Sequence, residues 1–385
     1  MQRTNNYPIV LVHGFIGWGA DQKIGQFLPY YGMWNGNAKV AILEDGIPCF
    51  APSVGPFSSM WDRACVLYAQ LKGGRVDFGK VHSEKYGHDR YGDTYEALIP
   101  DWGELSENGK LKKISLIGHS FGGPTMRQFI HLLAEGSEEE RAGTPADELS
   151  PLFEGGKAKW IHSCTSLSGT HNGATALESS APVVNPIQYF LYGLGNVLSG
   201  TKIAKYYNWN LDRFGISSAD HHIKLNKEGL SKYVHMKMDN IFYELSFDGA
   251  MEATKDFKPY DCIYYFSYPA KRTKQHFGFL ELPTRDMWLP ARLASLSECL
   301  YKSMRFGKEW QPNDGFVNVM STRGPLNEPK TDFVSNEESK PGIWNVMPVE
   351  WKDHLSYMGV GETKEEYNDF FKGLAERSAT LPVIE

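Results

Sequence analysis

The sequence has neither an excess of basic residues nor a long apolar run. Its 40 Lys and Arg residues are outnumbered by 46 Asp and Glu residues, which gives a formal net charge of −6. A protein that neutralises many phosphates needs a basic surface, so we expect no nucleic-acid partner. No stretch of about 18 or more apolar residues is present, which excludes an ordinary membrane-spanning helix. We therefore expect a protein that at most touches a membrane or oil surface.

Cysteine is scarce, and no leader segment is recognisable. The five cysteines are scattered along 385 residues, too few and too far apart for a disulfide scaffold or a Cys-x-x-Cys metal site. Only six residues precede the first apolar run, Tyr7–Val12, without the charged start, apolar stretch and cleavage site of a signal peptide. The chain is therefore either cytoplasmic or a form that has lost its leader.

What is present is an ordinary globular composition, with 41% hydrophobic residues and no internal repeat. A chain of this length can bury a large core, and we expect one domain, residues 1–385, with insertions. Long helical or irregular stretches separate the early apolar runs, a pattern typical of an α/β fold with a mostly parallel sheet covered by helices. The predicted buried strands are Ile9–Val12, Ile114–Ile117, Ile161–Leu167 and Cys262–Phe266, and a terminal helix is predicted at Lys364–Arg377.

Two connections, Gly55–Asp101 and Ser179–Ser246, are too long for simple crossovers between strands. The first is rich in Gly, His, Asp and aromatic residues. In the second, apolar residues recur at intervals of three and four, which predicts an amphipathic helix; they are Ile187, Phe190, Leu191, Leu194, Val197 and Leu198. Periodicity alone fits a core helix as well as a mobile cover. The charge-rich stretch Glu135–Arg141 indicates a solvated helix end or loop.

The most informative motif lies in the segment Ile114–Gly123. An apolar strand runs into Gly-His-Ser-Phe-Gly at 118–122, and a helix-compatible run, Met126–Leu133, follows. Strand, tight turn and helix are the context of a nucleophile elbow, in which small residues on both sides expose the serine hydroxyl at the edge of the sheet. Ser120 is therefore the candidate nucleophile; the alternative is a glycine-rich turn of an unrelated α/β fold.

A serine nucleophile needs a histidine base and a carboxylate that orients the base, in the chain order Ser, Asp or Glu, His. His354 is the last histidine and stands in a loop-like stretch. Asp314 lies in a Pro-Asn-Asp-Gly turn that can present a carboxylate, although such an aspartate often bonds only its own backbone. Asp353 and Asp286 compete with it. The other histidines after Ser120 are His131, His162, His171, His221, His222, His235 and His276.

The oxyanion of the tetrahedral intermediate needs hydrogen-bond donors, which backbone amides supply. The amide after the nucleophile belongs to Phe121, and the loop after the first predicted strand offers the amide of Phe15. His13, in the same loop, resembles a candidate base. Its place at a strand end favours a structural hydrogen bond instead.

Together these residues make the chain resemble the zinc-containing, thermoalkaliphilic lipase family of Gram-positive bacteria, within the α/β-hydrolases. The motifs that carry the resemblance span nearly the whole chain; they are Pro8–Gly19, Val54–Cys65, Ser150–Gly156, Asn313–Gly315 and Asp353–Leu355. The resemblance implies Ser120 as nucleophile, Asp314 as orienting acid and His354 as base. It also implies that the amides of Phe15 and Phe121 form the oxyanion hole. Family members often carry Gln at the position of Phe121, so we expect its ring to reshape the acyl-side wall of the pocket.

The family binds a structural zinc ion in the first long connection, which makes residues 55–101 a zinc-binding insertion. A His-x5-His spacing alone is a weak metal signal, although two imidazoles with carboxylates suit tetrahedral zinc. The resemblance implies a closed site with no open position at which water could be activated. Its implied ligands are Asp62, His82, His88 and Asp239.

Many members of the family also bind calcium, through an acidic residue two positions after the catalytic histidine and an Asp-Pro pair shortly beyond. This chain has Ser356 and then Gly361-Glu362 at those places. Calcium prefers several oxygen ligands, among them charged carboxylates. We therefore expect no calcium at that site.

The resemblance identifies residues 179–246 as a lid or cap region, whose apolar face covers the active site in water and turns toward a lipid surface. It implies hydrolysis of acyl glycerols and other hydrophobic esters. Aromatic residues make up 13% of the chain and leave room for a wide apolar cleft, so polyester surfaces are a further hypothetical substrate. We expect a monomer that acts outside the cell as a secreted protein. The alternatives are a short-chain carboxylesterase without interfacial activation and an acyltransferase.

Overall fold

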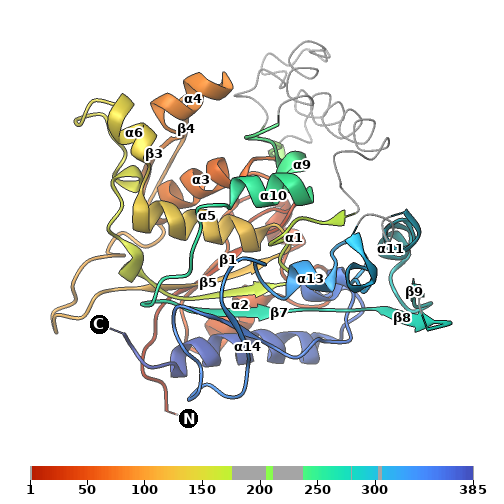
Figure 1. Ribbon diagram of the computed structural model, residues 1–385. Coiled ribbons are helices and arrows are strands. Elements are labelled where there is room, and N and C mark those ends of the chain that lie inside the picture. Colours follow the sequence, from red (N-terminus) through yellow and green to blue (C-terminus); the bar gives the residue numbers. More distant parts are fainter. Residues whose placement is uncertain (1, 176–204, 211–236, 279, 302–305, 385) are drawn as a thin grey trace.

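The computed structural model places a seven-stranded sheet between layers of helices (Figure 1). It describes residues 2–175, 205–210, 237–278, 280–301 and 306–384. The predicted amphipathic helix at 187–198, and with it most of the expected lid or cap region 179–246, lies outside the described residues.

All neighbouring strands of the main sheet are parallel. Their order across the sheet is β10-β11-β7-β6-β5-β1-β2. The strands are β1 (Ile9–Val12), β2 (Cys49–Phe50), β5 (Ile114–His119), β6 (Ile161–Leu167), β7 (Tyr264–Tyr268), β10 (Lys330–Asp332) and β11 (Trp344–Val346). The expectation of an α/β fold with a mostly parallel sheet is confirmed.

The four predicted strands form the centre of this sheet. β1 and β6 have the predicted bounds, β5 extends two residues further, to His119, and β7 begins two residues later, at Tyr264. Every residue of these strands is buried. Parallel sheets covered on both faces favour such continuous apolar runs, which is why the strands were visible in the sequence.

Helices cover both faces of the sheet. On one side α3 (Met60–Lys72) packs against α5 (Gly122–Glu135), and on the other α2 (Ala38–Glu44) packs against α14 (Lys364–Thr380). Figure 1 shows α3 and α5 above the sheet and α14 below it. The predicted terminal helix is thus confirmed as α14. It begins at a capping box, in which the Thr363 side chain and the Glu366 side chain each bond the other's backbone amide.

The expected zinc-binding insertion, residues 55–101, contains both core and peripheral structure. Its first helix, α3, is capped by the side chain of Ser59 and is part of the core layer. A two-stranded antiparallel hairpin, β3 (Gly74–Asp77) and β4 (Tyr91–Tyr95), follows and encloses α4 (Lys80–Tyr86). α4 packs against α6 (Glu138–Gly143), so the segment after α5 completes this peripheral layer.

The charge-rich stretch Glu135–Arg141 was expected to be solvated, and for Glu140 this is wrong. Glu135, Glu138, Glu139 and Arg141 are exposed, but Glu140 is 1% exposed because its carboxylate accepts backbone hydrogen bonds from α4. The spacing of charges along a sequence does not reveal such a partner.

The remaining described elements connect these strands and helices. No helix of the described residues is long and apolar enough to cross a membrane. The elements are α1 (Lys23–Phe27), η1 (Pro151–Glu154), η2 (Ala158–Trp160), α9 (Ile241–Glu244), α10 (Phe247–Ala253), the hairpin β8 (Thr273–His276) and β9 (Leu280–Pro283), α11 (Leu289–Tyr301), η6 (Lys308–Trp310), α13 (Val319–Thr322) and η7 (His354–Met358).

Candidate active site and metal centre

Ser120 occupies a strained turn between β5 and α5. Its φ of 57° lies in the left-handed region, where a non-glycine residue is uncommon and often functional. The turn is tight because a Cβ on Gly122 would lie 2.3 Å from the carbonyl oxygen of Val12. The Ser120 amide donates to the carbonyl of Leu167 in β6, at 2.9 Å. This is the geometry expected of a nucleophile elbow at the carboxyl end of a central strand.

His354 and Asp314 are in direct contact beside this turn. Nδ1 of His354 lies 2.8 Å from Oδ2 of Asp314, and the backbone amide of His354 donates to the carbonyl of Asp314, also at 2.8 Å. The ring of His354 lies 4.6 Å, centroid to centroid, from the ring of His119, the residue before Ser120. Asp314 is fully buried and Ser120 and His354 are nearly so. The structure therefore brings the predicted serine, histidine and aspartate to one place.

The carboxylate of Asp314 both bonds its own backbone turn and contacts the histidine. Oδ1 accepts from the backbone amides of Phe316 and Val317, at 3.1 and 2.8 Å, as in an ordinary Asx turn. Oδ2 is left to face His354. The local turn therefore orients the carboxylate toward the histidine.

The competing aspartates have other partners. Asp353 caps the turn η7 by accepting from the amides of Leu355 and Ser356, and its second oxygen accepts from the amide of Trp288. Asp286 is exposed and pairs with Arg272 at 2.6 Å.

Several other candidate histidines have partners of their own in the structure. His162 bonds Ser378 and Asn5, His171 bonds Ser166 at 2.8 Å, and His131 stacks on Phe257. His276 is an exposed residue of the β8–β9 hairpin. The positions of His221, His222 and His235 lie outside the described residues.

The two predicted oxyanion amides lie on neighbouring backbone segments. A Cβ on Gly14, the residue before Phe15, would lie 2.8 Å from Cβ of Ser120. Within the described residues, neither the amide of Phe15 nor that of Phe121 donates to another backbone carbonyl. The ring of Phe121 is fully buried and lies 5.4 Å from the guanidinium of Arg63. It therefore packs inside the protein, and its effect on the acyl-side wall of the pocket stays a prediction.

His13 and Arg63 hold the loop that carries Phe15. Nδ1 of His13 donates to the carbonyl of Gly14 at 2.9 Å, and its Nε2 accepts from the amide of Val54 at 3.0 Å. The guanidinium of Arg63 donates to the carbonyls of His13 and Gly14. Burial, and secondarily the charge of Arg63, keeps the pKa of His13 well below its usual value, so His13 stays neutral. The structural hydrogen bond expected for His13 is present.

The four predicted metal ligands form one cluster. Their ligand atoms lie within 4.8 Å of one another although they come from α3, α4 and the loops at 88 and 239. Nε2 of His82 lies 3.3 Å from Oδ1 of Asp239, and Nε2 of His88 lies 3.4 Å from its Oδ2. Nε2 of His82 makes no hydrogen bond to the described residues. Two imidazoles and two carboxylates at this spacing fit a tetrahedral divalent ion such as zinc.

The surroundings of the cluster also fit a cation. A third carboxyl, Glu244, is 5% exposed and accepts from the amide of Met60 at 2.7 Å. Burial, followed by the charges of Asp239 and Asp62, raises the pKa of Glu244 well above its usual value. Buried like charges repel each other, and a divalent ion would offset that repulsion.

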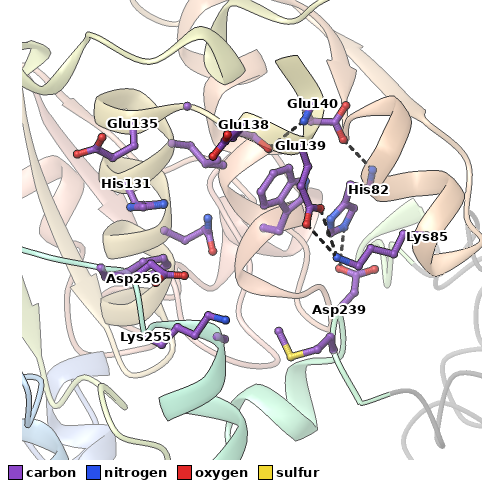
Figure 2. Close-up of a pocket in the computed structure, with 18 of the residues that line it drawn as sticks. His82, Lys85, His131, Glu135, Glu138, Glu139, Glu140, Asp239, Lys255 and Asp256 are labelled. Carbon is purple, nitrogen blue, oxygen red and sulfur yellow. Dashed lines mark hydrogen bonds and ion pairs between the residues drawn. The ribbon is translucent and has the colours of Figure 1, made fainter. Parts of the chain in front are cut away.

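Several neighbouring groups fix the ligand side chains. The ring of Trp61 stacks on that of His82 at 4.6 Å with an interplanar angle of 5°. Nδ1 of His88 donates to the carbonyl of Asp89 at 2.9 Å, which directs Nε2 toward the cluster. Figure 2 shows Glu140 reaching the start of the helix that carries His82, on the wall of a pocket of about 800 Å³.

Glu140 caps α4 from a different part of the chain. The N-cap residue of α4, Gly79, has no side chain to offer. Instead, Oε1 of Glu140 accepts from the amide of His82 at 2.7 Å and Oε2 accepts from the amide of Val81 at 3.2 Å. A Cβ on Gly79 would lie 2.4 Å from Oε1, so the glycine makes room for the carboxylate. Neither Glu140 nor Arg63 was singled out from the sequence, because their partners are distant backbone groups.

The residues at the expected position of the family's calcium site contact other groups of the chain. The hydroxyl of Ser356 faces Oδ1 of Asp353 at 3.4 Å. Glu362 pairs with Lys352 at 2.9 Å, so its charge already has a partner within the chain.

The parallel sheet and the serine elbow with its neighbouring His-Asp pair define the chain as an α/β-hydrolase. The family described as lipase-like, C-terminal domain matches residues 5–380. The chain therefore belongs to this family of lipase-like domains, as the resemblance indicated.

Individual relatives agree with this assignment. The chain is 32% identical to a lipase of Staphylococcus epidermidis over 97% of this chain and 54% of that protein. It spans about half the length of the curated relatives that it matches. Among solved structures, Staphylococcus hyicus lipase superposes with a TM-score of 0.84 at 27% identity, over 98% of this chain and 96% of that one. Lipase 1 from Pelosinus fermentans superposes with a TM-score of 0.80 at 34% identity, over 99% and 100%.

Proposed function

We propose that the protein hydrolyses carboxylic esters through an acyl-enzyme on Ser120. The observation that carries the proposal is the His354–Asp314 hydrogen bond of 2.8 Å beside the strained Ser120 turn. His354 takes the serine proton as the hydroxyl attacks the ester carbonyl, and Asp314 holds the Nδ1–H and stabilises the imidazolium. The amides of Phe15 and Phe121 stabilise the oxyanion.

The second half of the reaction repeats these roles with water. His354 gives its proton to the departing alcohol, which leaves the acyl group on Ser120. Water then attacks this acyl group while His354 removes the proton of the water, and the acid is released as the serine is reprotonated. No cofactor takes part in these steps.

We propose acyl glycerols and other hydrophobic esters as the substrates. The relatives named lipase support this class. Hydrolysis of polyester surfaces belongs to the same proposal, and release of monomer from a polyester film tests it. A carboxylesterase restricted to short, dissolved esters and an acyltransferase are the outcomes that would replace it.

We propose zinc as the ion held by the cluster of Asp62, His82, His88 and Asp239. With all four positions occupied by protein ligands, its contribution is to tie α3, α4 and the loop at 239 together. We further propose that no calcium binds near Ser356 and Glu362. Calcium-dependent thermal stability in zinc-replete protein would contradict this.

Where the protein acts and whether it is a monomer are part of the same proposal. We propose a secreted, monomeric form, as the resemblance to this lipase family implies. Fractionation of the producing cells and the mass in solution test the two statements.

The deciding experiment compares wild-type protein with Ser120→Ala on tributyrin and triolein, below and above their solubility limits. We expect activity only in the wild type, with a loss on the order of 10⁶-fold in kcat for the variant. Long-chain turnover that rises at the interface supports a lipase. Activity confined to dissolved short esters indicates a carboxylesterase, transfer to an added alcohol in preference to water indicates an acyltransferase, and an active Ser120→Ala overturns the mechanism.

A further inference from the structure

Tyr30 lies between the loop before Phe15 and the strand that ends at Ser120. It belongs to the connection between α1 and α2, is 5% exposed, and packs its ring against those of His13 and His119. Its hydroxyl lies 3.0 Å from the amide nitrogen of Gly14 and 2.7 Å from Nδ1 of His119. One side chain thus contacts the loop and the residue next to the nucleophile.

His119 continues these contacts to the proposed base. Its Nε2 lies 3.0 Å from the backbone carbonyl oxygen of His354. The ring is buried, with 1% exposed. From Gly14 to His354, four groups on four separate segments are therefore joined by three consecutive hydrogen bonds.

The direction of each hydrogen bond follows from the chemistry of the groups. A carbonyl oxygen only accepts, so Nε2 of His119 carries the proton. Burial, and secondarily His354, keeps the pKa of His119 well below its usual value, so the ring is neutral and Nδ1 must accept. The Tyr30 hydroxyl therefore donates to Nδ1 and accepts from the amide of Gly14. Each of the three hydrogen bonds therefore has one donor and one acceptor.

The hydrogen bond from His119 completes the attachment of His354. Its backbone amide and its Nδ1 both donate to Asp314 at 2.8 Å, and its carbonyl accepts from His119. This hydrogen bond joins the backbone of His354 to His119, the last residue of β5. Because Ser120 follows directly, the bond fixes the position of the base relative to the nucleophile. A base must stay within hydrogen-bond reach of the serine, and small displacements cost much of the rate.

We propose that Tyr30 and His119 are positioning residues for ester hydrolysis. Through these hydrogen bonds they hold the base His354 in place relative to Ser120 and to the loop that contains Gly14 and Phe15. The proposal rests on the proposed function. Neither residue touches the reacting atoms. Their loss is expected to lower kcat while substrate binding, measured as KM, changes little.

The test uses four variants of the full chain with a soluble ester, p-nitrophenyl butyrate. Tyr30→Phe removes only the hydroxyl. His119→Gln keeps an N–H the same number of bonds from Cβ as Nε2, whereas His119→Leu removes it. Tyr265→Phe is the matched control, because Tyr265 is also buried and its hydroxyl accepts from the backbone amide of Tyr260 at 3.1 Å, away from the proposed hydrogen bonds.

We expect Tyr30→Phe and His119→Leu to lose on the order of 10- to 100-fold in kcat, with KM within about twofold of the wild type. His119→Gln is expected to recover most of the loss in His119→Leu. Inactivation by a serine-reactive phosphonate should slow in Tyr30→Phe and His119→Leu by about the same factor as kcat falls. Tyr265→Phe should lose stability without loss of kcat. Equal kcat in Tyr30→Phe and Tyr265→Phe overturns the proposal.

Nitrogen-15 NMR of histidine-labelled protein tests the chain without reference to activity. The resonances absent from His119→Gln assign the ring, and we expect its proton on Nε2 in the wild type and a shifted Nδ1 resonance in Tyr30→Phe. A proton on Nδ1 of His119 in the wild type contradicts the proposed series of hydrogen bonds. A wild-type protein that neither hydrolyses the ester nor reacts with the phosphonate overturns the proposed function. Because the NMR experiment does not depend on activity, it tests the hydrogen bonds separately from that function.

Discussion

The serine site and the metal-ligand cluster use histidine and aspartate in opposite ways. At the serine site, His354 and Asp314 bond each other, backbone amides bond the second oxygen of Asp314, and His119 bonds the backbone carbonyl of His354. At the cluster, Asp62, Asp239 and two imidazoles converge on one point near a third buried carboxyl. The side chains of the serine site bond each other, whereas the arrangement of the cluster fits a cation.

This difference indicates what each region contributes. A site whose groups satisfy one another is organised before substrate arrives, which favours catalysis. A cluster of buried carboxylates is unfavourable until an ion binds, so binding the ion stabilises the folded state. Consecutive residues connect the two regions, since Asp62 belongs to the cluster and Arg63 holds the loop before Phe15.

After the loss expected for Ser120→Ala, the largest effect is expected from Asp314→Asn. An amide cannot serve as the negative partner of His354, and in the Ser-His-Asp proteases the equivalent change costs on the order of 10⁴-fold in kcat. Asp286→Asn is the matched control, because Asp286 is an exposed partner of Arg272. Hydrolysis of p-nitrophenyl butyrate measures both. Similar losses in the two variants would remove Asp314 from the mechanism.

Removal of the metal is expected to give the next largest effect, on stability. At free zinc about 1,000-fold above its Kd, binding to the folded state contributes about 4 kcal/mol. Dialysis against a chelator should lower Tm, and zinc, but not calcium, should restore it. Asp239→Asn protein should show little response to the chelator. An unchanged Tm in the wild type would argue against a structural ion.

Glu140→Gln should weaken the cluster without touching a ligand. An amide cannot accept from both Val81 and His82, which leaves a buried amide of α4 unpaired, at a cost of about 1–3 kcal/mol. Zinc affinity, measured by competition with a chelator, should fall about tenfold. Glu139→Gln, at the exposed neighbouring position, should change neither quantity. Equal affinities in the two variants would show that the cap does not position His82.

The smallest effect concerns pH and a histidine remote from both regions. Burial lowers the pKa of His162 to about 4, so below about pH 6.5 the unfolded chain binds a proton that the folded chain does not. Stability should therefore fall as pH decreases from about 6.5 to 4, with about 1 kcal/mol per pH unit from this residue. Denaturant unfolding of His162→Gln should show a shallower slope, while His276→Gln, on the exposed hairpin, keeps the wild-type slope. Identical slopes in all three proteins would contradict the assignment.

Much of the fold could be predicted because its signals are local. The four central strands are continuous apolar runs, and the Ser120 turn is marked by closely spaced glycines between a strand and a helix. β10, with three exposed residues, has no apolar pattern and was not predicted. The lid or cap region 179–246 stays a prediction. For the metal ligands, spacing alone was weak, because Asp239 is distant in the sequence from His82 and His88.

By itself the sequence determined the α/β class, the serine turn and the family, since these follow from periodicity, glycine placement and motifs within short segments. Tertiary structure alone decided which oxygen of Asp314 faces His354 and that Glu140 is buried beneath α4. It also joined Tyr30 and His119 to the base. The physical reason is that these contacts involve backbone amides and carbonyls, which every residue carries, so no side-chain pattern in the sequence marks the partner.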